Sequence, residues 1–382
     1  MGHLGDRSLR PDSAGMRLRL HLARTVDHDV WRSAREAIPE HRAVVVEVRA
    51  RGESGWGEAP EFMTSVYSSR LATLIERLRG VESILYSCDP ERPELTWARL
   101  APLLTDCPFA LGALDVACHD LAARLAGVPL YERLGCPDPT GRRSAYSIGL
   151  DEPEAMVAKL PESSDWHMYK VKLGKAGDLD VLRLLRKRTD APFWLDGNAG
   201  WARQDLEAVL GELPSLGVAA IEQPFPVGDR QAQLRAREVS PVPIFADESV
   251  TNREEFERHA GDFDGVNVKI LKAGGITPSL EILRACRERG VSTMLGCLPE
   301  SSIGASAAAH LSGMVDHVDV DTIALLATDT GTGIRLDGSG RIGLPDLPGT
   351  GFVPDAASEA WVVDPESVVG PVGAGLLGGV TG

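Results

Sequence analysis

The sequence predicts an α/β protein in two parts, and two patterns along the chain carry this prediction. From about residue 144 onward, short β-rich runs alternate with helical stretches, which is typical of a parallel sheet with helices packed against it. Before that point, β-rich runs come first and helices follow, which is typical of an α+β arrangement. A chain of 382 residues is long enough for two or three domains and can bury a full core without disulfide or metal cross-links.

The N-terminal part is expected to hold a small antiparallel sheet followed by helices. Residues 1–16 show no periodicity and indicate a loose leader. The polar stretch Arg24–His41 is too long for a tight turn, and such loops are often functional. The residue patterns predict strands at Arg17–Ala23, Ala43–Ala50 and Gly55–Ala59. They predict helices at Val66–Leu78, Leu95–Leu104 and Pro108–Ala126. Together these segments predict a first domain over residues 17–140.

The second part is expected to be an eight-stranded barrel over residues 141–330. Its β-rich runs recur about every 25 residues, the length of one strand, one helix and two loops. The runs are Ala145–Gly149, Tyr169–Leu173, Phe193–Asp196, Val218–Glu222, Ile244–Asp247, Gly265–Ile270, Thr293–Gly296 and His317–Asp321. Eight strands at this interval close most economically as a TIM-type barrel, with an open, doubly wound sheet as the alternative. Residues 331–382 are expected to return to the N-terminal domain.

Composition and charge exclude several classes of protein. The net charge of −15 opposes binding to nucleic acid, whose phosphates select basic surfaces. No apolar run reaches the roughly 18–20 residues of a membrane-spanning helix, and the charged N-terminus lacks the apolar core of a secretory signal. The six cysteines form no CxxC or zinc-type spacing and are expected to pack in the core. We therefore expect a cytoplasmic globular protein, monomeric or homo-oligomeric, that binds neither nucleic acid nor a membrane.

Charged residues stand at the ends of several predicted barrel strands. The carboxyl ends of the strands form the active-site face of a barrel, and an unpaired charge is expensive to bury there. Asp196, Glu222 and Asp247 end three successive strands at spacings of 26 and 25 residues, so they are expected to converge. Three carboxylates at one point repel one another unless a cation lies between them, and hard oxygen ligands suit Mg²⁺. The alternative is that the two aspartates cap helices and the glutamate lies on the surface.

Two lysines lie inside predicted strands rather than on helices. Lys172 and Lys269 belong to strands two and six, on opposite sides of the barrel mouth, so they would flank a molecule held over the metal. Lys170 shares the face of Lys172 by the two-residue period of a strand. A base that works near neutral pH needs a pKa about 3 units below the lysine reference, and repulsion from the neighbouring cation acts in that direction. The alternative is that these lysines are solvated surface residues.

These residues and their flanking motifs resemble the enolase superfamily. The motifs that carry the resemblance are, in order, KVKLG, WLDGNAGW, IEQPF, FADES and NVKILKAGG. GCLPESSIGASAAAHLSG and the lysine pair are similar to the muconate-lactonizing subgroup, and GWGEAPEF is similar to the N-terminal capping domain. The resemblance covers about residues 17–340 and implies a modified TIM barrel, (β/α)7β, with an α+β capping domain. It also implies one Mg²⁺ per subunit on Asp196, Glu222 and Asp247, with Lys172 and Lys269 as acid/base catalysts.

The chemistry of this superfamily fits the same residues. A proton α to a carboxylate is weakly acidic, and it leaves only if the developing negative charge meets a cation in a preorganised site. A lysine on each face of the α-carbon allows removal on one side and return on the other, which is epimerisation by an isomerase. The sequence favours such an enzyme over a binding protein that has kept only the scaffold, since all three acids and both lysines are present.

An Asp-x-Asp motif narrows the expected substrate. Asp319 and Asp321 would share a face of the eighth strand, although a helix cap or a surface acid pair is the alternative. The motif resembles the dipeptide epimerases, in which such a pair holds the α-ammonium group of the substrate. The resemblance implies a Mg²⁺-dependent epimerase of L-Ala-D/L-Glu or of another dipeptide. The alternatives in the same subgroup are an N-acylamino acid racemase, an o-succinylbenzoate synthase and a muconate cycloisomerase.

Further residues are candidates for supporting roles. Lys170 and Ser301 are expected to touch the substrate. Arg35, in the long loop of the capping domain, would suit an acidic side chain of the substrate, although that loop offers groups of both signs. Asn198 and Glu248 are expected to orient the metal ligands from outside, as partners of metal ligands commonly do, with a helix cap as the alternative for Glu248.

Overall fold

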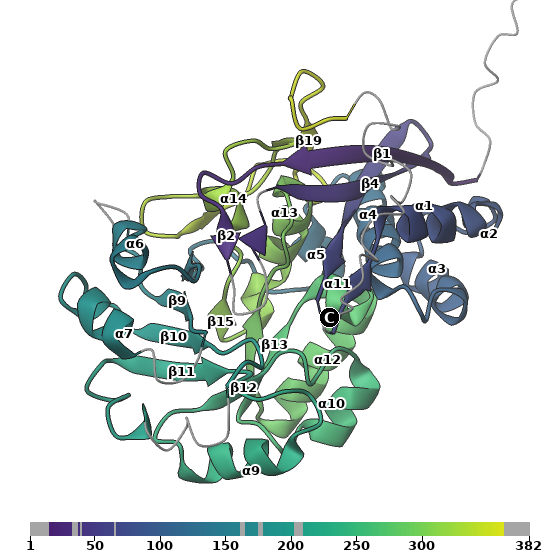
Figure 1. The fold of residues 1–382 in the computed structure, drawn as a ribbon. Coiled ribbons are helices and arrows are strands. Elements are labelled where there is room, and N and C mark those ends of the chain that lie inside the picture. The colour runs from purple at the N-terminus through teal and green to yellow at the C-terminus, as the bar shows by residue number, and fades with distance from the viewer. Residues whose placement is uncertain are drawn as a thin grey trace, which may run out of the picture.

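Two sheets organise the molecule: a three-stranded antiparallel sheet and, after it in the chain, an eight-stranded parallel sheet (Figure 1). The structure is a computed structural model that describes residues 15–32, 37–38, 40–64, 66–160, 165–174, 179–201 and 209–362. Most of the predicted leader, residues 1–14, lies outside the described residues. Met16, the last residue of that leader, is buried in the core of the N-terminal part.

The antiparallel sheet is covered on both faces. Its order is β1 (Arg17–Thr25), β4 (His41–Ala50) and β5 (Glu53–Pro60). In the central strand, Val44 and Val46 pack among the N-terminal helices, while Val45 faces the other way and packs with Ile303 and Phe352. The helices are α1 (Leu71–Gly80), α2 (Glu82–Tyr86), α3 (Pro93–Leu100), η1 (Ala101–Leu103), α4 (Pro108–Ala126) and α5 (Leu130–Leu134). The three predicted strands and the long helix before Gly127 are confirmed.

The segment predicted as a helix from Val66 to Leu78 is helical only in its second half. Phe62–Met63 and Ser68–Ser69 form a short antiparallel pair, β6 and β7, and α1 begins after it. The hydroxyl group of Ser69 donates a hydrogen bond to the carbonyl of Pro60 at 2.9 Å, which holds this stretch extended. The prediction was wrong here because a serine side chain bonds the backbone outside a helix.

The parallel sheet runs in chain order and closes into a barrel. Its strands are β8 (Tyr146–Ile148), β9 (Tyr169–Lys172), β10 (Phe193–Asp196), β11 (Val218–Glu222), β12 (Ile244–Ala246), β13 (Gly265–Val268), β14 (Ser292–Leu295) and β15 (His317–Val318). The backbone N–H of Ala145, beside β8, donates to the carbonyl of Val318 in β15 at 2.8 Å, so the first and last strands meet. This closure confirms the predicted barrel over the open, doubly wound sheet.

Helices follow the strands and pack around them (Figure 1). They are α6 (Pro153–Ala158), α7 (Leu179–Arg186), α9 (Arg230–Val239), α10 (Arg253–His259), α11 (Ile270–Ala273), α12 (Ile276–Arg289), α13 (Ser302–Leu311), η2 (Ser312–Met314) and α14 (Thr322–Leu325). Among the described helices, none combines the length and the apolar character that crossing a membrane requires.

Two barrel strands end two or more residues earlier than the sequence predicted. β13 stops at Val268, and α11 begins directly after Lys269. β15 stops at Val318, so Asp319 and Asp321 lie beyond the strand, the second of them directly before α14. In both places the chain turns into a short helix at the barrel mouth, which strand periodicity does not register. The charged residues therefore stand just outside the sheet, at the face where the predicted site lies.

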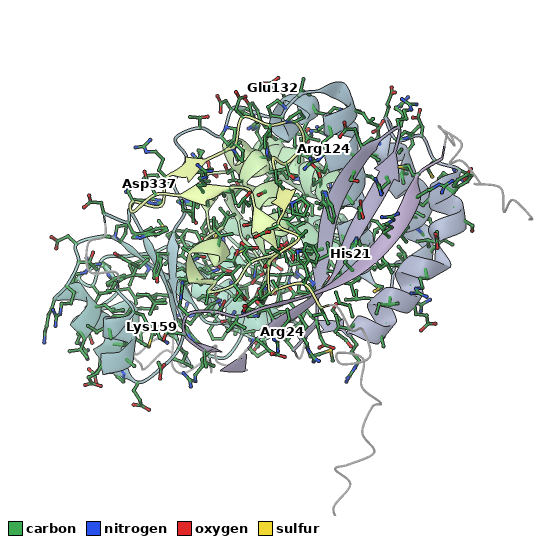
Figure 2. All side chains as sticks on the ribbon, turned by 90° about the horizontal axis from the view of Figure 1, so that it is seen from above. His21, Arg24, Arg124, Glu132, Lys159 and Asp337 are labelled. Carbon is green, nitrogen blue, oxygen red and sulfur yellow. The ribbon has the colours of Figure 1, made fainter. Side chains whose placement is uncertain are left out.

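The chain after the barrel returns to the N-terminal sheet. The backbone of Trp361 bridges to Ala23 in β1, and the ring of Trp361 lies 5.8 Å from the ring of His21, which Figure 2 labels on this sheet. The remaining short strands are β2 (Trp31–Arg32), β3 (Ala37–Ile38), β16 (Gly331–Thr332), β17 (Arg335–Leu336), β18 (Ile342–Gly343) and β19 (Val353–Pro354). Residues 363–382 lie outside the described residues, and the predicted domain boundaries stay predictions.

A close approach between β5 and α4 makes a test of this packing. A β-carbon on Gly57 would lie 2.1 Å from the carbonyl oxygen of Ala113 in α4. We expect Gly57→Ala to lower the free energy of unfolding by about 1–3 kcal/mol, the usual effect of overpacking, measured by urea denaturation. Gly80→Ala is the matched control, because nothing lies within 4 Å of a β-carbon there, and it should not lower stability. Equal stability of Gly57→Ala and the wild type would contradict the close contact.

Candidate active site

A cavity lies where the N-terminal part meets the carboxyl ends of the barrel strands. Its wall includes eight of the residues singled out from the sequence, which are Lys170, Lys172, Asn198, Asp247, Glu248, Lys269, Asp319 and Asp321. The N-terminal part contributes Asp27, His41, Phe62, Thr64 and Tyr67. The barrel thus brings together residues from most of the predicted motifs, and the N-terminal part covers them.

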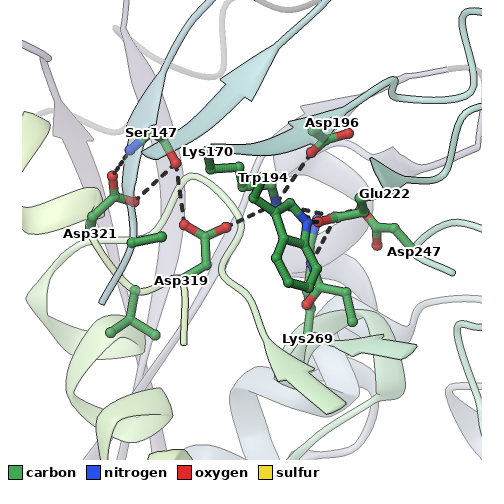
Figure 3. A network of polar contacts seen from close by, with 12 residues as sticks. Ser147, Lys170, Trp194, Asp196, Glu222, Asp247, Lys269, Asp319 and Asp321 are labelled. Carbon is green, nitrogen blue, oxygen red and sulfur yellow. Dashed lines mark hydrogen bonds and ion pairs between the residues drawn. The ribbon is translucent and has the colours of Figure 1, made fainter. Parts of the chain in front are cut away.

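The ammonium group of Lys170 lies at the centre of a network of carboxylates (Figure 3). Its Nζ is 2.9 Å from Oδ2 of Asp319, 3.0 Å from Oε2 of Glu222 and 3.2 Å from Oδ2 of Asp196. All four side chains are buried. Burial lowers the pKa of a lysine, but the three carboxylates outweigh burial and hold the pKa of Lys170 well above its ordinary value. Lys170 is therefore a fixed positive charge in the cavity wall.

The two lysines predicted as catalysts each pair with one of the predicted metal ligands. Nζ of Lys172 is 2.6 Å from Oδ2 of Asp196, and Nζ of Lys269 is 2.7 Å from Oδ2 of Asp247. Lys172 ends β9 and Lys269 follows β13, so they reach the cavity from different sides of the barrel. Burial lowers the pKa of Lys269, but the carboxylates of Asp247, Glu222 and Asp196 together outweigh burial and raise it above its ordinary value. The lower pKa that a base near neutral pH requires is therefore not found for Lys269, because a carboxylate is bonded to it.

Burial and neighbouring charges shift the pKa values of the three acids in different directions. Burial raises the pKa of Asp196, but the ammonium groups beside it outweigh burial and lower its pKa to about 2. The pKa of Asp247 falls well below its ordinary value by the same balance. Burial prevails at Glu222, whose pKa is raised even though the ammonium group of Lys170 lies beside it. Two of the three acids are thus anionic at neutral pH by a wide margin.

Three buried residues that the sequence interpretation did not single out hold these acids in place. The indole N–H of Trp194 donates to Oε2 of Glu222 at 2.8 Å, and the amide nitrogen of Asn267 donates to Oε1 of Glu222 at 2.8 Å. Nζ of Lys272 donates to Oδ1 of Asp247 at 2.7 Å and to the carbonyl of the same residue at 2.8 Å. All three stand inside the motifs that carry the resemblance, and Trp194 shares a strand face with the acid that ends β10. Strand periodicity was therefore the signal that could have identified Trp194.

The two carboxylates of the Asp-x-Asp motif turn toward Ser147 near the end of β8 (Figure 3). Oδ2 of Asp321 accepts a hydrogen bond from the backbone N–H of Ser147 at 2.5 Å, and Oδ1 of Asp319 accepts one from its hydroxyl group at 3.2 Å. Burial, followed by the charge of Asp319, raises the pKa of Asp321 to about 8. A cation placed between these carboxylates would relieve both effects, so the pair is suited to bind an ammonium group.

Asn198, which is expected to orient the metal ligands, is bonded to one of them. Its backbone N–H donates to Oδ1 of Asp196 at 2.9 Å, and its φ of 42° lies in the left-handed region that asparagine tolerates. Its side-chain oxygen is buried in the cavity wall and has no hydrogen-bond partner in the part of the chain that the structure describes. Glu248 lies in the same wall, directly after Asp247.

Ser301 faces the N-terminal part rather than the cavity. Its hydroxyl group donates to Oε2 of Glu58 at 2.9 Å, and its backbone N–H donates to Oε1 of the same residue at 2.9 Å. Burial, followed by the charge of Glu300, raises the pKa of Glu58 to about 8. The motif GWGEAPEF is thereby joined to the start of α13. Arg35, the remaining candidate for substrate contact, lies outside the described residues.

The donor set of the site suits a hard divalent cation. Asp196, Glu222 and Asp247 supply only carboxylate oxygens, which are the ligands that Mg²⁺ prefers, and all three are buried. Across the described ranges, no three acids, histidines or cysteines surround one point in metal-binding geometry. Lysine ammonium groups lie against the acids instead. The residues fit Mg²⁺ by donor type and burial, and the orphaned side-chain oxygen of Asn198 adds another hard donor to this wall.

The fold and the site together define a class of enzyme. A capped barrel with three buried acids and two opposed lysines at its mouth is suited to removing a proton α to a carboxylate. Residues 22–135 match the family model of the mandelate racemase/muconate lactonizing enzyme N-terminal domain, and residues 154–358 match that of the enolase C-terminal domain-like family. The chain therefore belongs to the enolase superfamily, as its motifs predicted.

Known relatives place the chain near one branch of that superfamily. An L-Ala-D/L-amino acid epimerase from Flavobacterium johnsoniae is 36% identical over 318 residues, which is 83% of this chain and 94% of the relative. The substrate-liganded L-Ala-D/L-Glu epimerase from Bacillus subtilis superposes with a TM-score of 0.84 at 26% identity, over 90% of this chain and 99% of that one. A dipeptide epimerase from Methylococcus capsulatus, complexed with Mg and L-Arg-D-Lys, gives 0.80 at 28% identity, over 89% and 99%.

Proposed function

We propose that this protein is a Mg²⁺-dependent dipeptide epimerase, an isomerase that removes and returns the α-proton of the C-terminal residue of its substrate. The observation that carries the proposal is the pair Asp319 and Asp321, buried in the wall of a cavity that also presents Lys172 and Lys269. Lys170 pairs with Asp319, whereas Asp321 has no ion pair among the described residues, and the free ammonium group of a dipeptide would supply the cation that Asp321 lacks. The predicted class of isomerase agrees with the activity named for the relatives.

Lys172 and Lys269 are the proposed acid/base pair on the two faces of the α-carbon. One of them must be neutral to accept the proton while the other is charged to return one. Each ammonium group is bonded to a carboxylate, and the acids around Lys269 raise its pKa. Deprotonation of Lys269 therefore depends on drawing charge away from its partner, Asp247.

Asp196, Glu222 and Asp247 are the residues that would hold Mg²⁺, with Asn198 and Glu248 beside them. When bound, Mg²⁺ supplies positive charge against these carboxylates and against the negative charge that develops on the carboxylate of the substrate. Trp194, Asn267 and Lys272 keep the acids oriented through their hydrogen bonds. Lys170 keeps its proton, and its proposed contact with the carboxylate of the substrate is weakened because Asp196, Glu222 and Asp319 share its ammonium group.

Other members of the subgroup remain the competing candidates. N-acylamino acid racemases, o-succinylbenzoate synthases and muconate cycloisomerases act on substrates that present an acyl group or a second carboxylate where a dipeptide presents its ammonium group. Such groups cannot neutralise Asp319 and Asp321, and a carboxylate would be repelled by them. The charge of this wall therefore favours a dipeptide.

We also propose a cytoplasmic location for the protein. All six cysteines are free thiols. Unpaired cysteines in this number fit a reducing compartment, where disulfides are rare.

Asp196→Asn tests the metal site without relying on activity. Added Mg²⁺ should raise the Tm of the wild type, because a ligand that binds only the folded state stabilises it. The variant should lose this shift, and calorimetric Mg²⁺ affinity should fall by at least ~10-fold, while the circular dichroism spectrum stays that of the wild type. Asp180→Asn, at an exposed acid of α7, is the control. Mg²⁺ binding that is unchanged by Asp196→Asn and by Asp247→Asn would place the metal elsewhere.

Lys269→Ala and Lys172→Ala test the two-base assignment. Each variant should lose epimerisation by at least ~100-fold, because return of the proton on the opposite face needs both lysines. In D₂O, each should still exchange the α-proton of one stereoisomer, and the two variants should retain opposite stereoisomers. Lys187→Ala, at an exposed lysine, is the control. The assignment fails if Lys269→Ala exchanges both stereoisomers at the rate of the wild type.

A dipeptide library screened for deuterium incorporation from D₂O in the presence of Mg²⁺ tests the function itself. Active dipeptides should lose roughly 10- to 100-fold in kcat/KM with Asp321→Asn, since a hydrogen bond to a charged group contributes about 1.5–3 kcal/mol. Acylation of the amino terminus should impair turnover by the wild type to a similar degree. Far better turnover of N-acetyl or N-succinyl amino acids than of any free dipeptide would assign the protein to the acylamino acid racemases.

A further inference from the structure

A smaller cavity adjoins the proposed substrate cavity. We name it the side cavity and define it by six residues of its wall, Asp27, Asp29, Tyr146, Ser147, Lys159 and Leu325. Asp27, Ser147 and Leu325 also line the substrate cavity, so the two spaces share a boundary. The side cavity therefore lies within reach of a substrate bound in the main one.

Backbone hydrogen bonds hold the loop that carries the two aspartates. The N–H of Ala327 donates to the carbonyl of Val26 at 2.7 Å, and the N–H of His28 donates to the carbonyl of Leu325 at 2.8 Å. Asp27 is thus clamped to the end of α14, the short helix that begins directly after Asp321. The aspartates stand beside the proposed ammonium site because of the fold, before any ligand binds.

The side cavity begins next to that ammonium site. Ser147, which is part of its wall, is bonded to both Asp319 and Asp321. Lys172 and Lys269, which flank the α-carbon of the second residue, line only the main cavity. A group that branches from the carbon beside the ammonium group therefore meets the side cavity first. In a dipeptide, that group is the side chain of the N-terminal residue.

The lysine of the side cavity is held in an ion pair. Nζ of Lys159 lies 3.1 Å from Oδ2 of Asp151, and that carboxylate also pairs with Arg32 at 3.0 Å. Lys159 stands at the edge of the barrel, where Figure 2 labels it. Two cations share one carboxylate, so this cluster keeps one positive charge, which the two aspartates of the side cavity outnumber.

The remaining charge of the side cavity is negative. Two aspartates line this cavity, and Oδ2 of Asp27 lies 2.8 Å from Nε2 of His41. Asp29 is exposed and has no salt-bridge partner within the described ranges of the chain. Burial, followed by the charge of Asp321, raises the pKa of the Tyr146 hydroxyl to about 12, so this group is a neutral hydrogen-bonding partner.

We propose that the side cavity binds the side chain of the N-terminal residue of the dipeptide and selects a positively charged one, lysine or arginine. This inference rests on the proposed function and names the substrate class of the same site. The aliphatic stem of such a side chain would pack on Leu325 while its charged end reaches Asp29. A glutamate in this position would face two carboxylates, and an alanine would leave the space empty.

The test compares dipeptides that differ only in their first residue, with the second residue kept at the one that the D₂O library shows to be accepted best. We expect kcat/KM for dipeptides beginning with L-Lys or L-Arg to exceed that for L-Ala by about 2- to 5-fold, the range that an exposed ion pair allows, and to exceed that for L-Glu further. Asp29→Asn should reduce the ratio of the L-Lys to the L-Ala substrate, and Asp29→Lys should shift the preference toward L-Glu. Glu154→Gln, at an exposed acid of α6 outside the side cavity, is the matched control and should leave the ratio unchanged.

The outcomes separate this inference from the function on which it rests. The inference is wrong if dipeptides are epimerised efficiently with no preference for a cationic first residue. It is also wrong if Asp29→Lys leaves such a preference intact. Either result leaves the proposed function standing. Exchange with none of the dipeptides, while N-acylated amino acids are turned over, overturns both.

Discussion

The buried ammonium group of Lys170 and the carboxylates bonded to it constrain the rest of the site. Lys170 on β9 reaches Glu222 at the end of β11 and Asp319 after β15, which are 52 and 149 positions away in the chain. A charge buried this deeply is tolerated only when opposite charges lie at hydrogen-bond distance. The barrel must close with these strand ends at one level, because an open sheet would separate the ammonium group from Asp319. Closure of the barrel thus both assembles the site residues and pairs the buried charges with one another.

The N-terminal part covers the cavity while the barrel holds the charges. Its attachments at the barrel mouth include Glu58 to the start of α13 and Asp27 to the end of α14. It also contributes Phe62, Tyr67 and His41 to the cavity wall. Substitutions in these loops can change which side chains fit without disturbing the network around Lys170. This division between a constant barrel and variable loops is a general property of barrel enzymes.

Much of the fold and several charged residues of the site were predictable from the sequence by itself. The strands Phe193–Asp196 and Val218–Glu222 have the predicted bounds, because alternation with helices and β-rich composition are local properties of the chain. Motifs around Asp196, Glu222 and Asp247 placed these acids at one edge of the barrel, since the carboxyl ends of parallel strands meet there. The superfamily followed from the order and spacing of those motifs, which the family models match.

The tertiary structure alone decided which of these groups touch. Asp319 and Asp321 lie beyond their strand and accept hydrogen bonds from Ser147. Ser301 donates to Glu58 and does not line the cavity. Lys269 pairs with a carboxylate, and its pKa is raised. The sequence interpretation required a lower pKa for this lysine. The physical reason is common to all of these differences. A pKa and a hydrogen bond depend on burial and on neighbours from distant parts of the chain, whereas spacing along the sequence records only the path of the backbone.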